Sequence, residues 1–242
     1  MLMFNGRWRT TCPSEHVTQS IEFAYQSVYL RAMLKSMTKP RIIEAAGRLF
    51  HEEGIRAVSM DAIAEKCGVT KRTLYYHFRS KDDLITAYLE ARDQPSLSLF
   101  RKWFAQSQGD AAERIKGVFE NLARNAKHPK WKGCGFLRTS VELIKLPGHP
   151  AMESGRRHKK RLETWFASIL CDELPLEEAE PVARQIVLLL DGAFSVVLLH
   201  RDPSYMLSAG DAAATLIRAT TKRVGGSKWS CSDETSRPSR SQ

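Results

Sequence analysis

The sequence lacks a cysteine pattern that could build a disulfide framework or a zinc site. Its five cysteines are odd in number and scattered along 242 residues, and no two of them form a C-x-x-C pair. Disulfide frameworks and structural zinc sites both require paired cysteines at short, regular spacings. We therefore expect a protein of the reducing cytoplasm that needs no metal and no other cofactor.

An apolar run long enough to cross a bilayer is also missing. The most apolar stretch, residues 186–199, has 14 residues and contains Asp191, whereas a membrane-spanning helix needs about 20. The first twelve residues carry Arg7 and Arg9 but no apolar segment after them, so we expect no signal peptide. These absences argue against a membrane partner.

Glycine and proline are few, with 14 and 10 residues, while 43% of the chain is hydrophobic. This composition is ordinary for a globular chain with a sizeable core, and the length allows one or two domains. The net charge of +10 favours a polyanionic partner. Charge alone does not separate nucleic acid from a membrane surface or from a need for solubility.

Two short helices joined by a glycine are predicted between residues 59 and 84. The first carries apolar residues at helical spacing, namely Met60, Ile63, Ala64 and Cys67. Ser59 is placed to cap this helix, and Gly68 can adopt the left-handed conformation that ends it. Thr70 offers a cap for the second helix, residues 71–77, which directs a cationic face outward. The pattern is typical of a helix-turn-helix, whose second helix enters the major groove of DNA.

A more specific signature lies in the second helix and just after it. The segment TLYYHF over residues 73–78 is followed by SKDDL over residues 80–84. This resembles the TetR-type (TetR/AcrR-like) transcriptional regulators, whose recognition helix carries T-L-Y-x-H-F before a lysine-led helix. The resemblance extends back through residues 41–50 and the turn at Gly54, about 45 residues without a gap.

The resemblance implies an all-α fold with two domains. An N-terminal three-helix helix-turn-helix domain, residues 39–84, would bind DNA, and a C-terminal helical domain, residues 85–223, would bind a ligand and dimerise. Residues 1–38 are expected to be an extension, either preceding an alternative start at Met33 or Met37 or forming a short accessory helix. The Gly/Ser-rich residues 224–242 are expected to be a disordered tail.

The family resemblance also implies a function. The chain would be a homodimeric repressor of a palindromic double-stranded DNA operator, released by a small-molecule effector whose identity the sequence does not give. Two other classes stay open: a DNA-binding regulator that senses no ligand, and an enzyme on a helical scaffold.

Most of the predicted DNA contacts lie on the outward face of the second helix, at Lys71, Arg72, Thr73, Tyr75, Tyr76 and His77. Lys71 and Arg72 are best placed to read base edges, because they stand at its N-terminal end and arginine matches guanine bidentately. Thr73 and Tyr76 are expected to touch bases or thymine methyl groups. The alternative for the whole set is a solvated helix face.

Contacts to the DNA backbone are expected around this helix. By analogy with the family they are made by Tyr75, His77 and Lys81. Ser59 is expected to cap its helix and touch phosphate, and Lys39 and Arg41 are candidate phosphate contacts of an N-terminal arm. Asp61 would repel phosphate if it faced the DNA backbone.

A second surface is predicted in the C-terminal half. The helix expected over residues 177–200 is apolar nearly all round, so it must be covered on both sides. One cover is a symmetry copy, and a last helix over residues 203–223 would complete a four-helix dimer interface as in the family. The interface is predicted at Leu189, Gly192, Ala193, Val196, Leu199 and Leu216.

The other candidate groups carry weaker signals. An effector cavity is predicted among Phe100, Trp103, Phe119, Phe136, Met152 and Trp165, with core packing as the alternative. The basic run at residues 156–161 is either a second nucleic-acid patch or a solvated helix face. Nothing in the spacing of Cys134, His149, His158 and Asp191 places a base beside the thiol or builds a metal site, so we expect no enzyme. Pro95 is expected to interrupt or kink its helix.

Overall fold

The computed structural model describes residues 37–227, and every regular element in this range is an α-helix. A helix over residues 37–53 comes first. The later helices are α2 (Met60–Cys67), α3 (Lys71–His77), α4 (Lys81–Gln106), α5 (Ala111–Ala126), α6 (Gly135–Glu142), α7 (Pro150–Leu170), α8 (Leu176–His200) and α9 (Ser204–Ser227). The all-α prediction is confirmed. The expectations for residues 1–36 and 228–242 lie outside the described residues.

The two motif helices form where the local signals place them. The side chain of Ser59 accepts a hydrogen bond from the backbone N of Ala62 at 3.1 Å and so caps α2. Gly68 ends α2 with φ of 68°, a left-handed conformation that glycine adopts without steric cost. The Thr70 hydroxyl then accepts from the backbone N of Thr73 at 3.1 Å and caps α3.

A first hydrophobic core joins the helix over residues 37–53, α2, α3 and the start of α4. Leu74 of α3 is fully buried in it, and the core continues along α4 to Leu89. Phe136 of α6 and Ala151 of α7 also belong to this core. The start of α7 and the short α6 are therefore packed directly on the N-terminal unit, and no loose linker separates the two halves at residue 84.

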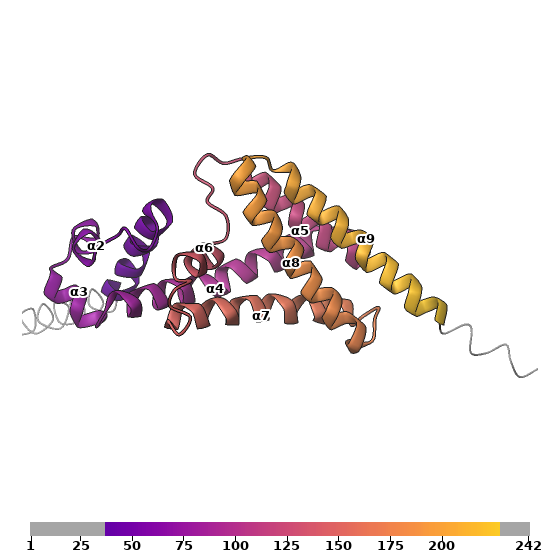
Figure 1. Ribbon diagram of the computed structural model, residues 1–242, viewed down its shortest axis with the longest axis horizontal. Helices are drawn as coiled ribbons and strands as arrows, with labels where there is room; N and C mark the ends of the chain where they lie inside the picture. Colours follow the sequence, from indigo (N-terminus) through magenta and orange to yellow (C-terminus); the bar gives the residue numbers. More distant parts are fainter. Residues whose placement is uncertain (1–36, 228–242) are drawn as a thin grey trace, which may run out of the picture.

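The second core fills the space between the remainder of α4 and α5, α7, α8 and α9 (Figure 1). Phe119 and Phe166 are completely buried at its centre. The helices α5 and α9 lie side by side, and a Cβ at Gly210 of α9 would lie 2.8 Å from Cβ of Phe119. Glycine at this position therefore lets the two helices approach closely.

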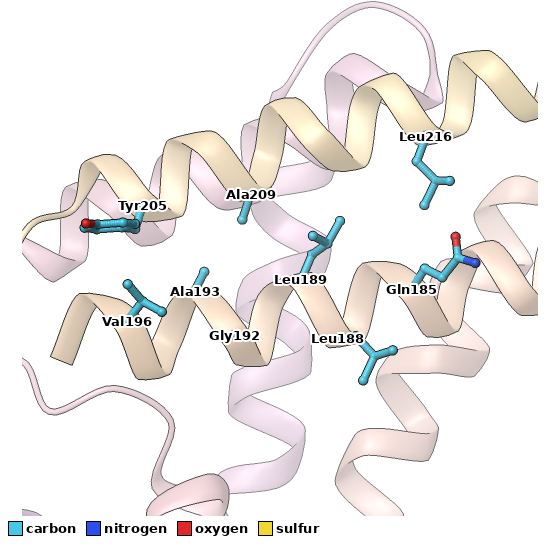
Figure 2. Close-up of a pocket in the computed structure, with 9 residues that line it drawn as sticks. All are labelled: Gln185, Leu188, Leu189, Gly192, Ala193, Val196, Tyr205, Ala209 and Leu216. Carbon is cyan, nitrogen blue, oxygen red and sulfur yellow. The ribbon is translucent and has the colours of Figure 1, made fainter. Parts of the chain in front are cut away.

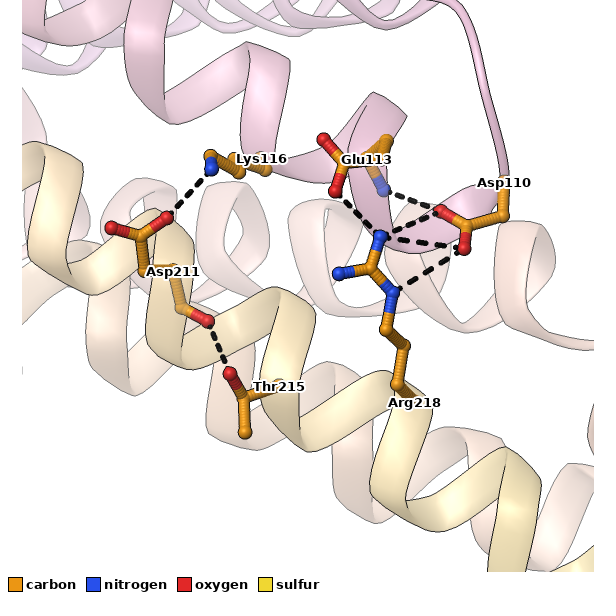
Figure 3. A network of polar contacts seen from close by, with 6 residues as sticks. All are labelled: Asp110, Glu113, Lys116, Asp211, Thr215 and Arg218. Carbon is orange, nitrogen blue, oxygen red and sulfur yellow. Dashed lines mark hydrogen bonds and ion pairs between the residues drawn. The ribbon is translucent and has the colours of Figure 1, made fainter.

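Ion pairs join the same two helices on their outer side (Figure 3). Arg218 Nη2 of α9 lies 2.5 Å from Oε1 of Glu113, and its Nε lies 3.4 Å from Oδ2 of Asp110, the N-cap of α5. Lys116 of α5 reaches Asp211 at 2.7 Å. These groups are exposed enough that each pair contributes little by itself. Their arrangement nevertheless fixes the register of α9 along α5.

The helix α4 continues through Pro95 to Gln106, so the predicted interruption there is wrong, while the alternative of a kink stays a prediction. Buried side chains on both sides of the proline, Asp93 and Leu97, hold the helix against its neighbours. The last helix continues past residue 223 to Ser227, because Val224 still packs against the second core.

Within residues 37–227, α8 alone is long and apolar enough to cross a membrane by length and composition. A helix in the core of a globular protein can have the same length and composition. The helix α8 packs against α7 and α9 in this way. Its residues Ile186 and Leu190 are fully buried between them.

Candidate nucleic-acid interface

The helix α3 presents an exposed polar face beside a buried anchor. Leu74 and Phe78 point into the first core, whereas Arg72, Tyr75 and Tyr76 are exposed, the last of them at 69%. The Tyr76 ring meets the His77 ring edge-on, with centroids 5.1 Å apart. Of the predicted residues of α3, Lys71, Arg72, Tyr75 and Tyr76 are thus exposed, and Thr73 and His77 are half-buried.

Lys71, at the start of α3, is tied to the helix before it. Its Nζ lies 2.9 Å from Oδ1 and 3.1 Å from Oδ2 of Asp61 in the first turn of α2. The hydrogen bond and the attraction to this carboxylate raise the pKa of Lys71. The acidic group that the sequence marked as repulsive to phosphate therefore has a cationic partner across the helix-turn-helix.

Thr73 takes part in the cap of α3 as well as in its outer face. Its hydroxyl lies 2.8 Å from that of Thr70, and its backbone N donates to the same Thr70 oxygen. This pairing orients the half-buried Thr73 side chain before any partner arrives.

Lys81 is turned partly inward. Its Nζ donates to the carbonyl oxygen of Arg56 at 3.2 Å, and burial lowers its pKa. The carboxylate of Glu142, at the end of α6, accepts from the backbone N of Arg56 at 3.0 Å. Lys81 and Glu142 line one pocket of about 380 Å³. The hydrogen bond between Arg56 and Glu142 therefore connects the N-terminal unit to α6, and Lys81 lies beside this connection.

The cations at the start of the first helix have contacts of their own. Arg41 Nη2 donates to the carbonyl oxygen of Cys67 at 3.1 Å, which satisfies a carbonyl at the end of α2. The ammonium group of Lys39 lies 5.6 Å from the centre of the Phe78 ring. Both side chains belong to exposed residues, so the remaining donors of each are open to solvent.

The sequence did not predict the contacts that α6 and the loop after it make with the N-terminal unit. Arg138 Nη1 donates to the carbonyl oxygen of His51 at 3.2 Å, and His149 Nε2 lies 3.2 Å from Oδ1 of Asp82. These partners are 87 and 67 positions apart in the chain. No local pattern signals such pairs.

An apolar groove of about 530 Å³ runs between α8 and α9 (Figure 2). Five of the six residues predicted for the dimer interface line it: Leu189, Gly192, Ala193, Val196 and Leu216. The sixth, Leu199, lies outside the lining and is exposed on α8. Leu188 and Tyr205 are also exposed along the groove.

The six residues predicted for an effector cavity are divided between the two cores. Phe100, Trp103, Phe119 and Trp165 belong to the second core, and Phe100 stacks on Trp103 with ring centroids 5.7 Å apart. Phe136 belongs to the first core, and Met152 packs against it. The structure does not bring these six side chains together.

The residues considered for catalysis pair with other side chains and not with one another. Lys159 Nζ lies 3.7 Å from Sγ of Cys134 and is ion-paired with Asp191. His158 Nδ1 lies 2.7 Å from Oδ1 of Asp93. Among the described residues, no three or more His, Cys, Asp or Glu side chains are grouped so that they could hold a metal ion.

Known proteins resemble the chain most clearly over its N-terminal part. The family model described as bacterial regulatory proteins, tetR family, matches residues 42–88. The HTH-type transcriptional regulator UidR of Escherichia coli K12 is 40% identical over 65 residues, which are 27% of this chain. The chain spans 33% of the length of UidR.

Other similarities extend much further. A TetR-family transcriptional regulator from Streptomyces coelicolor superposes with a TM-score of 0.62 at 27% identity, covering 78% of this chain and 96% of that one. A regulator from Cytophaga hutchinsonii, at 18% identity, shares the fold with a TM-score of 0.66 and covers 76% of this chain and 95% of that one. The HTH-type transcriptional regulator AcrR of Shigella flexneri is 33% identical over 167 residues, which are 65% of this chain and 75% of AcrR. The chain therefore belongs to the TetR family of bacterial regulatory proteins.

Proposed function

We propose that this protein is a cytoplasmic transcriptional repressor that binds a palindromic DNA operator as a homodimer and leaves it when a small molecule binds. The observation that carries the proposal is the exposed face of α3, a helix that is capped by Thr70 and anchored by the buried Leu74. A rigid helix with cationic and hydrogen-bonding side chains at its N-terminal end fits a major groove.

The two parts of the chain would divide this work. Residues 39–84 would form the DNA-binding domain, with Arg72 reading base edges and Tyr75 and His77 binding phosphate. Residues 85–223 would hold the effector and the dimer interface. Of the relatives named above, UidR, AcrR and the Streptomyces protein are called transcriptional regulators.

One copy of α3 covers only a few base pairs, so specificity requires a second copy. The apolar groove between α8 and α9 supports a symmetric interface, because a second α8 would cover Leu189, Ala193 and Val196. The two recognition helices would then reach successive major grooves, about 34 Å apart.

Release by an effector would act through the contacts between the two cores. The helices α6 and α7 contribute Phe136 and Ala151 to the first core, and Glu142 binds the backbone of Arg56. A ligand that binds better to a form in which these contacts are shifted would favour a dimer that no longer matches its operator. Only this difference in affinity, and not tight binding by itself, would release DNA.

The test is selection of bound sequences from random DNA with the full chain, followed by fluorescence anisotropy on the selected duplex at several salt concentrations. We expect an inverted-repeat site, steep salt dependence and a loss of at least about tenfold in Arg72→Ala and in Tyr76→Ala. Arg124→Ala, which removes an exposed arginine on α5, is the matched control and should bind as the wild type does.

Selection of no sequence, or equal binding by Arg72→Ala and Arg124→Ala, would refute the DNA-binding role. A site without an inverted repeat would refute the dimeric mode alone. If the operator is bound but none of the metabolites and drugs in a library releases it, the regulator without a ligand is the better description.

A further inference from the structure

A positively charged groove of about 540 Å³ lies between α4 and α7, which run side by side (Figure 1). Four cationic side chains line it: Arg101 on α4 and Arg157, Lys160 and Arg161 on α7. None of the described residues that line the groove is acidic. All charged groups of the lining are therefore positive, although carboxylates outside the lining pair with Arg157, Lys160 and Arg161.

The charges converge because of helical spacing. Arg157, Lys160 and Arg161 are separated by three and four positions, so they share one face of α7. Arg101 stands on the facing helix and makes no ion pair with any described residue. Lys160 is 64% exposed, and its carboxylate partner, Glu163, does not line the groove.

Two of the cations are held in place from behind. Arg161 is ion-paired with Asp93, whose side chain is only 6% exposed, and Arg157 Nη2 lies 3.0 Å from Oε1 of Glu90. Both arginines also line a smaller adjacent cavity of about 300 Å³ that contains these carboxylates. The two arginines therefore form the wall between the groove and the smaller cavity. A guanidinium has five N–H donors, so an arginine that is paired with one carboxylate keeps other donors for a ligand in the groove.

The groove has an apolar floor as well as a charged rim. Trp165 and Leu97 are both buried and line it. A basic helix face that is only solvated would have no buried apolar residues beneath its charges. The volume of the groove also lies within the range of about 300–1,000 Å³ that is typical of small-molecule sites. Along α4, Arg101 is 20 residues beyond Lys81, or roughly 30 Å at 1.5 Å per residue. The groove is therefore not a continuation of the α3 surface.

We propose that this groove binds a small organic anion, whose carboxylate, sulfonate or phosphate head is held by Arg101, Lys160 and the free donors of Arg161, and whose apolar body lies on Trp165. The planar guanidinium of one arginine can donate two parallel hydrogen bonds to such a head group. The proposal goes beyond the proposed function because it names a ligand class and its place, and it does not depend on DNA binding, because ligand binding is measured without DNA.

The test is isothermal titration calorimetry on the full chain with 2-naphthoate, 2-naphthalenesulfonate and 2-naphthyl phosphate, and with neutral 2-naphthamide as the matched ligand. We expect one site per chain for at least one of the anions, with an affinity at least about tenfold higher than that of the amide. The double variant Arg101→Gln/Lys160→Gln should weaken binding of that anion by at least about tenfold.

The matched protein control is Arg156→Gln. Arg156 belongs to the same basic run but does not line the groove; it contacts Glu153 and the carbonyl oxygen of Pro147. It should bind the anion as the wild type does. Thermal melting of both variants checks that they fold, which we expect because the replaced side chains are exposed.

Three results would overturn the proposal. The first is that none of the three anions binds. The second is that the amide binds as tightly as the best anion, and the third is that Arg156→Gln loses as much affinity as the double variant. A nucleic-acid role would be indicated instead if the double variant weakened binding of the selected duplex as much as Arg72→Ala does. The site would then be a phosphate contact and not an organic-anion site.

Discussion

Lys71 Nζ lies 2.9 Å from Oδ1 of Asp61, so the first residue of the recognition helix is paired with the first turn of the helix before it. Both side chains are more than half exposed. An exposed pair of this kind contributes little to stability. Its importance is that the ammonium group that we propose as a DNA contact is already paired with a carboxylate of the same protein.

Asp61→Asn should therefore strengthen DNA binding. The change removes a negative charge beside the proposed phosphate surface and frees Lys71, so we expect affinity for the selected duplex to rise about three- to tenfold and its salt dependence to steepen by about one unit. Fluorescence anisotropy across a salt series measures both. Asp172→Asn, an exposed acid in the turn after α7, is the control and should change neither. Weaker binding by Asp61→Asn would mean that Asp61 positions Lys71 for its contact.

The sequence predicted the helix-turn-helix well because its signals are local. Ser59 and Thr70 cap the helices that follow them, and Gly68 alone supplies the left-handed residue between them. Each signal acts within four residues, so a pattern can show it. The same holds for the buried stripe of α2, from Met60 to Cys67.

Contacts between distant segments could not be predicted in this way. Asp93 meets His158 across 65 positions, and Arg56 meets Glu142 across 86. Neither residue of either pair carries a local sign of its partner. The same holds for the aromatic residues: the sequence shows that Phe119 and Phe136 are apolar, but only the packing of α5 and α6 places them in different cores.

Gly68→Ala should destabilise the protein. Nothing lies within 4 Å of the added Cβ, so the cost comes from the backbone, whose φ of 68° is unfavourable for a residue with a side chain. We expect the free energy of unfolding to fall by about 1–2 kcal/mol. Gly148→Ala is the control, because its Cβ also meets nothing and its φ is not positive. Urea denaturation compares the two, and equal stabilities would show that the turn is not strained by alanine.

Gly192→Glu should separate dimerisation from folding. Gly192 is exposed in the middle of α8, lines the apolar groove and has nothing within 4 Å of an added Cβ. Replacing a helical glycine favours the helix by about 0.5–1 kcal/mol, whereas a buried carboxylate would oppose a symmetric interface. We expect a folded monomer by sedimentation velocity at micromolar concentration, with no inverted-repeat binding. Gly192→Ala should fold and remain a dimer; a dimeric Gly192→Glu protein would place the interface elsewhere.

His158 should make stability depend on pH between about pH 6.5 and pH 4. Its burial is the main cause of a pKa lowered to about 4, and repulsion from Lys159 adds to it while Asp191 opposes it. Asp93, its hydrogen-bond partner, is already paired with Arg161. The neutral ring is therefore favoured in the folded state. Below the unfolded pKa of about 6.5 the unfolded chain binds more protons, so stability is lost as the pH falls towards 4.

This lowering of the His158 pKa corresponds to a loss of roughly 3 kcal/mol in the free energy of unfolding between pH 6.5 and pH 4, at 1.36 kcal/mol per pKa unit. His158→Asn keeps a donor near Asp93 but does not titrate, so its free energy of unfolding should change less with pH than that of the wild type. The absolute stability of the variant is lower, because the ring stacked on Phe136 with centroids 3.8 Å apart is lost. Urea denaturation at pH 7 and pH 4.5 gives the change in the free energy of unfolding with pH for the wild type and for His158→Asn. Equal changes in the two proteins would show that groups other than His158 cause the acid sensitivity.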